Sequence, residues 1–534
     1  MERRKGTRRI LVPLIASLAL VAVACEGGAE EGAPSGEIDE VTWALPDIPD
    51  VLLVPHDWTT YQGAVMSLVE EGMLAFGDDL QLIPALAESW EQVDDTTYVF
   101  TLREGVTFHD GSPLTPEDVV YSITWHLDPD NASQLAAFFR SVEAVEATGE
   151  REVTVRLKNP DAQFLYSLAH MAGFVMKKDQ LEANPETFGT PDVLPLGTGP
   201  YRLVEFVPDE RIVLERYDGY WGDQGPVRRI VIRPIPDQQT RLLALQNGDI
   251  DGTFDVPVSE VDQWERLENA RVVTAPSLGV YLFTLDQETP PFDDIHVRRA
   301  IAYSVDREGL VQAVLKGKGE AAVAINPPGM WAGVLPEDEV RAFYDTLPSY
   351  SFDLEKARQE LAQSSVPGGF EATVNVPNTD PLMINAALNL SENLKQIGVT
   401  LDVRQVDPGE WLDVYFAHED LGIQMMAYFP DFADPVNYPY LFLYSGNAVR
   451  DGLNGSNYRN PEVDAAIETA LRSSDPAERA AALQEAIRIA QEEVAVVPIY
   501  WPDSAMAISA DLRLDGYNAF WYNIPWAIRG FGPA

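Results

Sequence analysis

The sequence feature that most constrains the fold is a strand–helix–strand pattern in the C-terminal third of the chain. Residues 372–376 alternate as a strand, and Asp380-Pro381 opens a helix whose apolar side chains recur every three to four residues until Gly398 ends it. Residues 399–403 then alternate as a second strand. Two strands joined by such a helix run parallel with a right-handed crossover. This part of the protein is therefore predicted to be α/β.

Other segments predict further helices and strands. Residues 98–102 alternate as a strand, whereas residues 61–74 carry apolar residues at helical spacing. Thr115-Pro116, Asn460-Pro461 and Asp475-Pro476 each place a capping side chain before a proline that fits the first helical position. Residues 151–157 and 211–235 are richer in strands. We therefore predict an α/β fold with mixed sheets, and a chain of this length implies more than one domain.

The N-terminus has the pattern of a secretory leader. Residues 1–9 are strongly basic, residues 10–24 form an apolar run, and Cys25 follows as the single cysteine of the chain. This pattern is typical of a signal peptide, and the apolar run is short for a membrane span. Ala22-Val23-Ala24-Cys25 resembles the bacterial lipobox, whose cysteine is acylated, and residues 25–36 resemble a flexible tether. The alternative is an ordinary secretory signal with an incidental cysteine.

We accordingly expect a signal peptide at residues 1–24, a lipidated tether at 25–36, and an extracytoplasmic protein held to the bacterial cell membrane by lipid at Cys25 alone.

The whole chain carries a net charge of −46, and the leader holds five basic residues and one glutamate, so the mature chain carries −50. So acidic a surface argues against nucleic acid as a partner and against direct adhesion to anionic lipid.

Residues 424–446, QMMAYFPDFADPVNYPYLFLYSG, have the composition of a pocket wall. Three prolines break any helix, and aromatic side chains surround the carboxylates of Asp431 and Asp434. An apolar lining with a few placed polar groups is typical of a ligand pocket, and a carboxylate within it suits a cationic group such as an α-amino group. The alternative is a core loop with buried aromatics, in which the aspartates cap turns.

Motifs for catalysis or metal binding are absent from the sequence. There is no Gly-x-Ser-x-Gly elbow, and the six histidines are scattered without zinc-ligand spacing. His109-Asp110-Gly111 lies in a turn after a strand, where a structural role is expected. We therefore expect no enzymatic activity, no metal and no cofactor. The alternative of another class is a surface hydrolase that uses Asp431 and Asp434 as acid and base.

Five ordered stretches resemble the extracytoplasmic solute-binding proteins that serve peptide-type ABC importers. The longest runs from Pro84 to Ser122 and follows the family's P-x-LAESWE and FHDG-x-PLT-x-EDV-x-YS patterns. Residues 197–201 fit the GTGPY turn, residues 291–308 the PF-x-D to DR segment, residues 431–435 the D-Y-x-D-P segment, and residues 460–464 the NPE-x-D segment. The order of five motifs along one chain is more specific than any single motif.

The resemblance implies a two-lobed, three-domain clamshell like that of periplasmic binding proteins. Carried onto this chain, domain I is discontinuous and comprises residues 37–60, 196–284 and 502–534. Domain II is an insertion at 61–195, and domain III covers 285–501. The hinge is then expected near Leu285 and near Trp501, with closure over ligand as a hinge motion.

The resemblance also implies which residues meet the ligand. In peptide-binding members, the first aspartate of the D-Y-x-D-P segment accepts the α-ammonium group of the peptide, and Asp431 stands at that position. Phe432 replaces the tyrosine of the motif, and Asp434 is expected to brace the turn. The predicted ligand-binding residues are Asp431, Tyr428, Phe429, Phe432 and, more weakly, Trp411.

The function implied is that of a monomeric substrate-binding lipoprotein of an ABC importer. It is expected to capture short peptides between its lobes and deliver them to the membrane permease. The family also includes binders of nickel chelates, haem and oligosaccharides. Oligosaccharide is the strongest alternative ligand, because the chain has 11 Trp and 20 Tyr residues.

Overall fold

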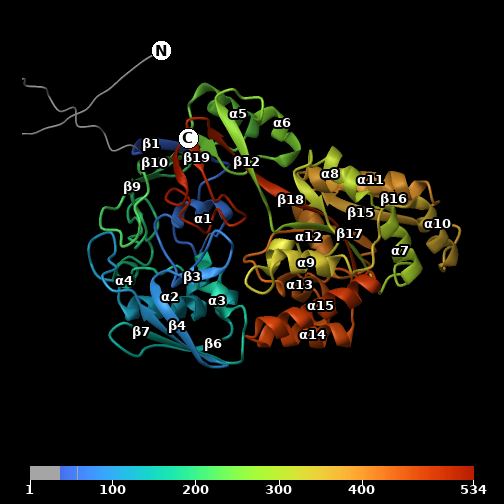
Figure 1. Cartoon of the computed structure of the whole chain (residues 1–534), viewed down its shortest axis with the longest axis horizontal. Coiled ribbons are helices and arrows are strands. Elements are labelled where there is room, and N and C mark those ends of the chain that lie inside the picture. The colour runs from blue at the N-terminus through green and yellow to red at the C-terminus, as the bar shows by residue number, and fades with distance from the viewer. Residues whose placement is uncertain (1–35, 57) are drawn as a thin grey trace, which may run out of the picture.

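The computed structural model describes residues 36–56 and 58–534, which form two lobes (Figure 1). We call residues 36–276 with 503–534 the N-terminal lobe and residues 280–500 the C-terminal lobe. The predicted signal peptide, Cys25 and the tether up to residue 35 lie outside the described residues. No helix in the described part of the chain is long and apolar enough to cross a membrane. The division into three domains stays a prediction.

The N-terminal lobe is built on a mixed sheet. Strand β1 (Ile38–Leu45) runs parallel to β10 (Val227–Pro234) and to β11 (Gly252–Thr253). Strands β9 (Arg211–Arg216) and β8 (Tyr201–Val207) continue the sheet in antiparallel order. Trp43 of β1 is fully buried, with its ring centroid 4.8 Å from that of Phe254 and 4.9 Å from that of Trp526. The remaining elements of this part are α1 (Thr60–Met66), β2 (Leu74–Phe76), β3 (Leu82–Pro84), α5 (Gln238–Asn247), α6 (Val261–Trp264), β19 (Leu512–Leu514) and β20 (Phe531–Pro533).

A second, antiparallel sheet forms the outer part of this lobe. Its strand order is β4 (Ala87–Asp94), β5 (Thr97–Leu102), β7 (Glu152–Leu157) and β6 (Val142–Ala147). The predicted alternation in β5 is confirmed, because Tyr98, Phe100 and Leu102 are buried. Helix α2 (Pro116–Leu127) begins where predicted, and Asp118 accepts a hydrogen bond from the Thr115 N–H at 3.0 Å in a capping box. Short helices α3 (Phe164–Ser167) and α4 (Lys178–Ala183) complete this part.

His109 has the structural role that its sequence context predicts. Its Nδ1 accepts a hydrogen bond from the Gly197 N–H at 3.2 Å, and its Nε2 donates to the Gly199 carbonyl at 3.0 Å. Burial lowers the pKa of His109 to about 4, so the ring is neutral. The His109 side chain thus joins the Pro84–Ser122 stretch to the turn at residues 197–201.

The helix predicted over residues 61–74 is wrong in its second half. Helix α1 ends at Met66, and the chain turns before β2 begins at Leu74. The carbonyls of Leu68 and Val69 accept hydrogen bonds from the N–H groups of Tyr201 and Gly199, at 2.9 and 2.8 Å. These long-range bonds, made to the turn at residues 197–201, replace the hydrogen bonds that a continuing helix would make.

The C-terminal lobe contains the predicted parallel pair. Strands β15 (Glu371–Pro377) and β16 (Thr400–Val406) are parallel and joined by α11 (Pro381–Lys395), which confirms the strand–helix–strand prediction. Helices α14 (Pro461–Arg472) and α15 (Pro476–Glu492) also begin at the predicted prolines. The other elements of the lobe are β13 (Val280–Leu285), α7 (Ile295–Ser304), α8 (Arg307–Ala313), β14 (Gly319–Ala321), α9 (Glu337–Tyr344), α10 (Leu354–Gln363), α12 (Pro408–Ala417), β17 (Ile423–Tyr428) and α13 (Asn437–Leu443).

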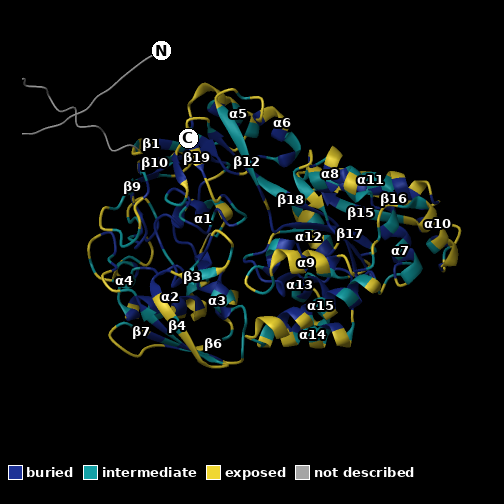
Figure 2. Ribbon diagram, viewed as in Figure 1, coloured by how far each residue is buried: buried dark blue, intermediate teal, exposed yellow. Residues whose placement is uncertain are grey.

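One long strand, β18 (Val496–Ser509), belongs to both lobes. Its first half pairs with β13 and β14, and its second half pairs with β11 and with β12 (Ala270–Pro276), all antiparallel. Figure 1 shows β12 and β18 passing side by side between the lobes, and Figure 2 shows most of their residues as buried or intermediate. The second crossing segment, Ser277–Gly279, joins β12 to β13, and the Ser277 N–H donates to the Pro502 carbonyl at 3.2 Å. Two adjacent chain segments therefore connect the lobes.

Candidate functional site

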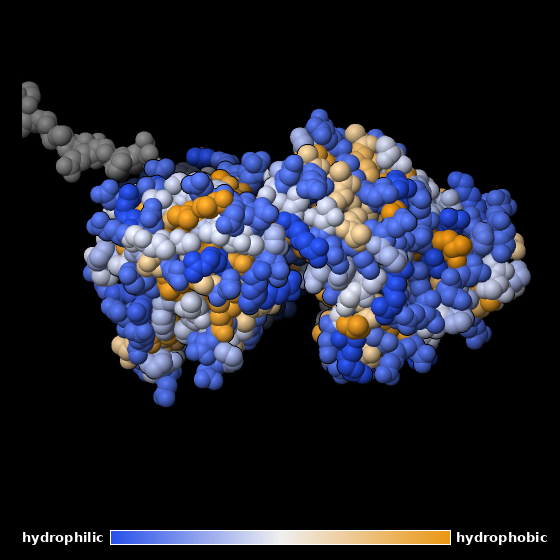
Figure 3. All heavy atoms as spheres, turned by 90° about the horizontal axis from the view of Figure 1, so that it is seen from below, coloured by the Kyte–Doolittle hydropathy of each residue, from blue (hydrophilic) through white to orange (hydrophobic). Residues whose placement is uncertain are grey.

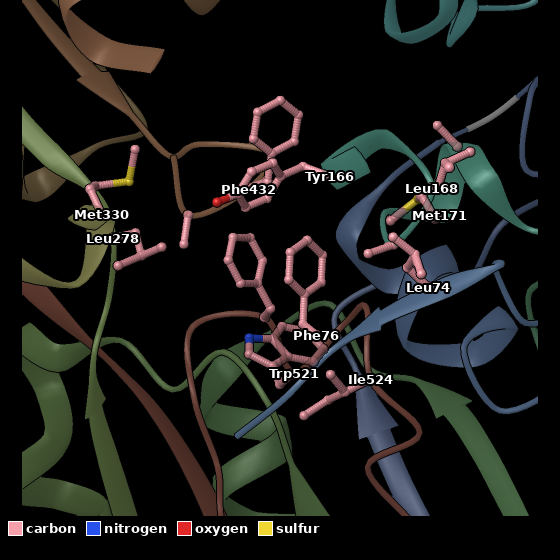
Figure 4. Close-up of a cluster of buried hydrophobic side chains, with 14 of the residues drawn as sticks. Leu74, Phe76, Tyr166, Leu168, Met171, Leu278, Met330, Phe432, Trp521 and Ile524 are labelled. Atoms are coloured by element: carbon pink, nitrogen blue, oxygen red, sulfur yellow. The ribbon is translucent and has the colours of Figure 1, made fainter. Parts of the chain in front are cut away.

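Phe432 marks one place where the two lobes touch. It follows β17 in the C-terminal lobe and is 5% exposed. Its ring stacks on Tyr166 of the N-terminal lobe with centroids 5.5 Å apart, and it meets Phe138 edge-on at 6.2 Å. Figure 4 shows Phe432 and Tyr166 side by side, with Phe76 and Trp521 of the N-terminal lobe nearby. The predicted pocket residue Phe432 is thus part of an apolar contact between the lobes.

Asp431 lies next to this contact and has no charged partner among the described residues. Its side chain is partly buried, and apart from its own N–H no group in the described ranges pairs with its carboxylate. Burial raises the pKa of Asp431 to about 6. Its charge in turn contributes to raising the pKa of Tyr428 and Tyr438 in its own lobe and of Tyr522 in the N-terminal lobe, in each case after burial. Asp431 therefore stands among tyrosines from both lobes.

Asp434, three residues further on, has a full set of partners. It has no exposed surface, and its carboxylate accepts a hydrogen bond from Arg479 of α15 at 2.5 Å and from the Val436 N–H at 2.9 Å. Arg479 itself is 5% exposed and also donates to the Ala470 carbonyl at 3.0 Å. Asp434 thus braces the turn, as predicted. It cannot act on a substrate together with Asp431, which removes the arrangement required by the hydrolase alternative.

The other predicted residues lie at different depths around the same segment. Tyr428 is partly buried and meets Phe442 edge-on at 5.7 Å. Phe429 is 54% exposed and covers Gly279, where a Cβ atom would lie 2.4 Å from its ring. Trp411 is partly buried in α12 and donates its indole N–H to the Met425 carbonyl at 3.2 Å. The structure brings Tyr428 and Phe429 to the seam between the lobes, whereas the polar atom of Trp411 is used inside the C-terminal lobe.

A cavity of about 680 Å³ lies between the lobes at the crossing strands. Seen from below, the molecule is hollowed between its two lobes (Figure 3). The N-terminal lobe contributes residues 78–81, 275–276 and 517–519, and the C-terminal lobe contributes residues 327–329 and 332–337. The crossing segments contribute Leu278 and Trp501, and the N-terminal lobe also contributes Asp503. The size of the cavity is that of a small-molecule pocket, and its walls combine apolar and polar side chains.

The sequence reasoning missed the polar residues of this cavity. Five of its lining side chains are carboxylates, and Arg341 is its single lining cation. The Arg341 guanidinium donates to both carboxylate oxygens of Glu320, at 2.9 and 3.0 Å, and to Glu337 at 2.8 Å, and its side chain is 46% exposed. The sole feature of the sequence that pointed to this cavity was the predicted hinge near Trp501. Within residues 36–56 and 58–534, no group of three or more His, Cys, Asp or Glu side chains is placed to hold a metal ion.

Two lobes that are joined by crossing strands and enclose a cavity have the architecture of a clamshell binding protein. The model of the bacterial extracellular solute-binding proteins, family 5 (middle), matches residues 81–449. This match covers more than half of the chain, so the protein belongs to that family, the solute-binding proteins of peptide-type ABC importers.

Individual relatives agree with this assignment. Heme-binding protein A of Haemophilus influenzae is 29% identical over 451 residues, which cover 78% of this chain and 78% of that protein. Glutathione-binding protein GsiB of Salmonella typhimurium is 26% identical over 478 residues, covering 88% and 89%. The structure of the periplasmic binding protein DppA from Helicobacter pylori, in complex with the peptide STSA, is similar with a TM-score of 0.73 at 23% identity, covering 91% of this chain and 97% of that one.

Proposed function

We propose that this protein is the substrate-binding lipoprotein of an ABC importer, that it captures short peptides between its lobes, and that it delivers them to the membrane permease. The observation that carries the proposal is the carboxylate of Asp431, which is desolvated at the seam between the lobes and has no charged partner within the described ranges. A desolvated carboxylate gains most from a ligand that supplies a positive charge and hydrogen-bond donors. The α-ammonium group of a peptide supplies both.

The comparisons support this choice of ligand class. Glutathione, the ligand in the name of one relative, and the peptide in the DppA structure both carry an amino group that is positively charged at neutral pH. Haem, the ligand in the name of another relative, carries none. The tyrosines around Asp431 provide an apolar wall with polar tips, which suits a peptide backbone.

Closure of the lobes follows from the same arrangement. The groups beside Asp431 come from both lobes, so a ligand there makes its full set of contacts only when the lobes are together. The adjacent segments Ser277–Gly279 and 501–502 are proposed as the hinge, because they are the two connections that cross between the lobes.

Replacing Asp431 tests the proposal directly. Asp431→Asn keeps the size of the side chain and removes its charge. Breaking a desolvated charge pair costs roughly 2–5 kcal/mol. The affinity for tri-alanine should therefore fall by a factor of between about 30 and several thousand. N-acetyl-tri-alanine should bind the wild type with a similar loss and lose little further on the variant, because both changes remove one and the same contact.

Calorimetric titration of both peptides on both proteins measures this effect. Asp413→Asn, which removes the same charge from an exposed position on α12, is the matched control and should bind like the wild type. If Asp431→Asn folds and binds both peptides with unchanged affinity, Asp431 does not hold an α-ammonium group and the peptide proposal fails.

Lipid anchoring at Cys25 is the second part of the proposal. It rests on the basic and apolar leader that precedes the single cysteine. Cys25→Ser should leave peptide binding unchanged and move the protein from the membrane fraction to the soluble fraction. An unchanged membrane fraction would contradict the anchor.

A further inference from the structure

The seam between the lobes is held by contacts that join protein to protein. Tyr166 of the N-terminal lobe is 8% exposed, and its ring stacks on Phe432 of the C-terminal lobe with centroids 5.5 Å apart. Phe138, also of the N-terminal lobe, meets the same ring edge-on at 6.2 Å. An aromatic pair is stabilising beyond the apolar area that it buries. These contacts need no ligand, so they favour closed lobes by themselves.

The hydroxyl of Tyr166 reaches further into the C-terminal lobe. A Cβ atom added to Gly333 would lie 3.5 Å from this oxygen. Burial raises the pKa of Tyr166, and the charge of Asp434 raises it further, whereas the charge of Arg479 lowers it. One tyrosine of the N-terminal lobe thus lies against three separate segments of the C-terminal lobe, namely those that hold Gly333, Phe432 and Arg479.

A backbone hydrogen bond also crosses the seam. The Ala162 N–H, four residues before Tyr166, donates to the carbonyl of Leu471 near the end of α14 at 2.9 Å. In Figure 1, α14 lies beside the outer part of the N-terminal lobe, at the opposite end of the seam from the crossing strands β12 and β18. A rotation about a hinge moves the parts that are furthest from it the most. Opening of the lobes about the crossing strands therefore separates this hydrogen bond.

We propose that these contacts form a clasp that holds the lobes together before any ligand binds. Phe138, Ala162 and Tyr166 are its members on the N-terminal lobe, and Phe432 and Leu471 are its members on the C-terminal lobe. The inference goes beyond the proposed function, because the clasp does not depend on the class of ligand. A ligand that prefers the closed form binds with an apparent dissociation constant equal to its intrinsic constant divided by the closed fraction. The clasp thus strengthens the binding of every such ligand.

Hydrogen exchange of the Ala162 N–H in ligand-free protein tests the clasp. A hydrogen-bonded amide exchanges when its bond opens, so its protection measures the ratio of closed to open lobes. The Ala162 N–H should be protected in the wild type. Tyr166→Ala should lower this protection roughly 2- to 10-fold, the range expected for one aromatic pair. Tyr166→Phe, which keeps the ring, should retain most of it.

A variant on the opposite lobe separates opening of the lobes from local loosening. Phe432→Ala should lower the protection of the Ala162 N–H to a similar extent, although Phe432 belongs to the C-terminal lobe, and it serves if Tyr166→Ala does not fold. The Lys158 N–H donates to the Ser141 carbonyl at 2.7 Å within the N-terminal lobe. Its protection should stay the same in each variant, because this bond does not cross the seam.

Tyr303→Ala is the matched control for the loss of an aromatic pair. Tyr303 meets Tyr350 edge-on at 5.3 Å inside the C-terminal lobe, so its replacement should leave the protection of the Ala162 N–H unchanged. A wild type in which this N–H exchanges like an unprotected amide would overturn the clasp. Protection that Tyr166→Ala and Phe432→Ala both leave unchanged would also overturn it. Neither result bears on the ligand of Asp431, which the peptide titrations test separately.

Discussion

Asp431 and Asp434 are three residues apart on one turn, yet their surroundings are opposite. Asp434 has no exposed surface and is held by Arg479 and a backbone N–H, whereas Asp431 is partly buried and lacks a charged partner in the part of the chain that the structure describes. A buried carboxylate that already accepts hydrogen bonds from the protein gains nothing from a ligand, so its role is structural. A desolvated carboxylate without donors can still gain from a ligand. The comparison therefore separates scaffold from binding site on one short segment.

The largest expected effect comes from breaking the structural pair. Arg479→Met should lower the free energy of unfolding by about 3–5 kcal/mol, because it leaves the carboxylate of Asp434 buried without its partner. Urea denaturation followed by circular dichroism measures the loss.

The control for this change lies on the same helix. Arg488, like Arg479, forms ion pairs. Its partners are Glu485 at 2.6 Å and Glu492 at 2.8 Å, but its side chain is 40% exposed. Arg488→Met should therefore cost less than about 1 kcal/mol. Equal losses in the two variants would mean that burial does not set the strength of these pairs.

A second pair of neighbours, Glu70 and Glu71, extends the comparison to the N-terminal lobe. Glu71 accepts hydrogen bonds from Thr198, Tyr220 and Trp221 at 2.9–3.0 Å. Burial raises the pKa of Glu71 more than these donors lower it, so the pKa is about 7. Glu70 is 3% exposed and lacks such donors among the described residues, and burial alone raises its pKa to about 8. Glu70 is therefore protonated at neutral pH, unlike Asp431.

This difference predicts a pH dependence of stability. Because the folded state holds the proton of Glu70 up to about pH 8 and the unfolded state releases it near 4.5, stability from Glu70 is complete at low pH and is lost as pH rises between these values. The loss amounts to about 3 kcal/mol by pH 7. Glu70→Gln should therefore gain stability relative to the wild type, by about 1.4 kcal/mol per pH unit between pH 5 and 7. Unfolding in urea at pH 5, 6 and 7 measures it, and a difference that is independent of pH would contradict the prediction.

The smallest effect concerns ligand binding at Asp431. Since the pKa of Asp431 is about 6, its charge is present at pH 7 and is lost as pH falls through 6, while a peptide α-amino group stays charged throughout. The affinity for tri-alanine should fall about fivefold between pH 6 and 5, because the ionised fraction of Asp431 falls from about one half to about one tenth. Asp431→Asn should show no such fall, and calorimetric titration at both pH values checks it. A wild type whose affinity is constant over this range would place the titrating group elsewhere.

The sequence determined the local elements and the family. The capping residues Thr115 and Asn460, the prolines that follow them and the alternation in β5 act over a few residues, so they could be read without tertiary structure. Asp431 was identified because its segment resembles a family motif, and Asp434 because a turn favours a bracing carboxylate. These inferences needed information from one stretch of chain at a time.

The cavity wall could not be predicted in that way. Asp503 and Trp501 on β18, Leu278 in the other crossing segment and Asn518 near the C-terminus meet only because β18 pairs with strands of both lobes. Whether a carboxylate has a partner likewise depends on distant residues: Arg479 reaches Asp434 from α15, and no cation among residues 36–56 and 58–534 pairs with Asp431.

The segment after α1 shows the same limit in the backbone. Residues 61–74 have the apolar spacing of a helix, and the sequence alone predicts one. The folded chain ends the helix at Met66, because the turn at residues 197–201 packs against Leu68 and Val69 and takes their carbonyls as hydrogen-bond acceptors. A Cβ atom on Gly197 would lie 1.8 Å from the Val69 carbonyl oxygen, so this approach requires glycine. Local spacing determined where a helix could begin, and a contact from more than a hundred residues away decided where it ends.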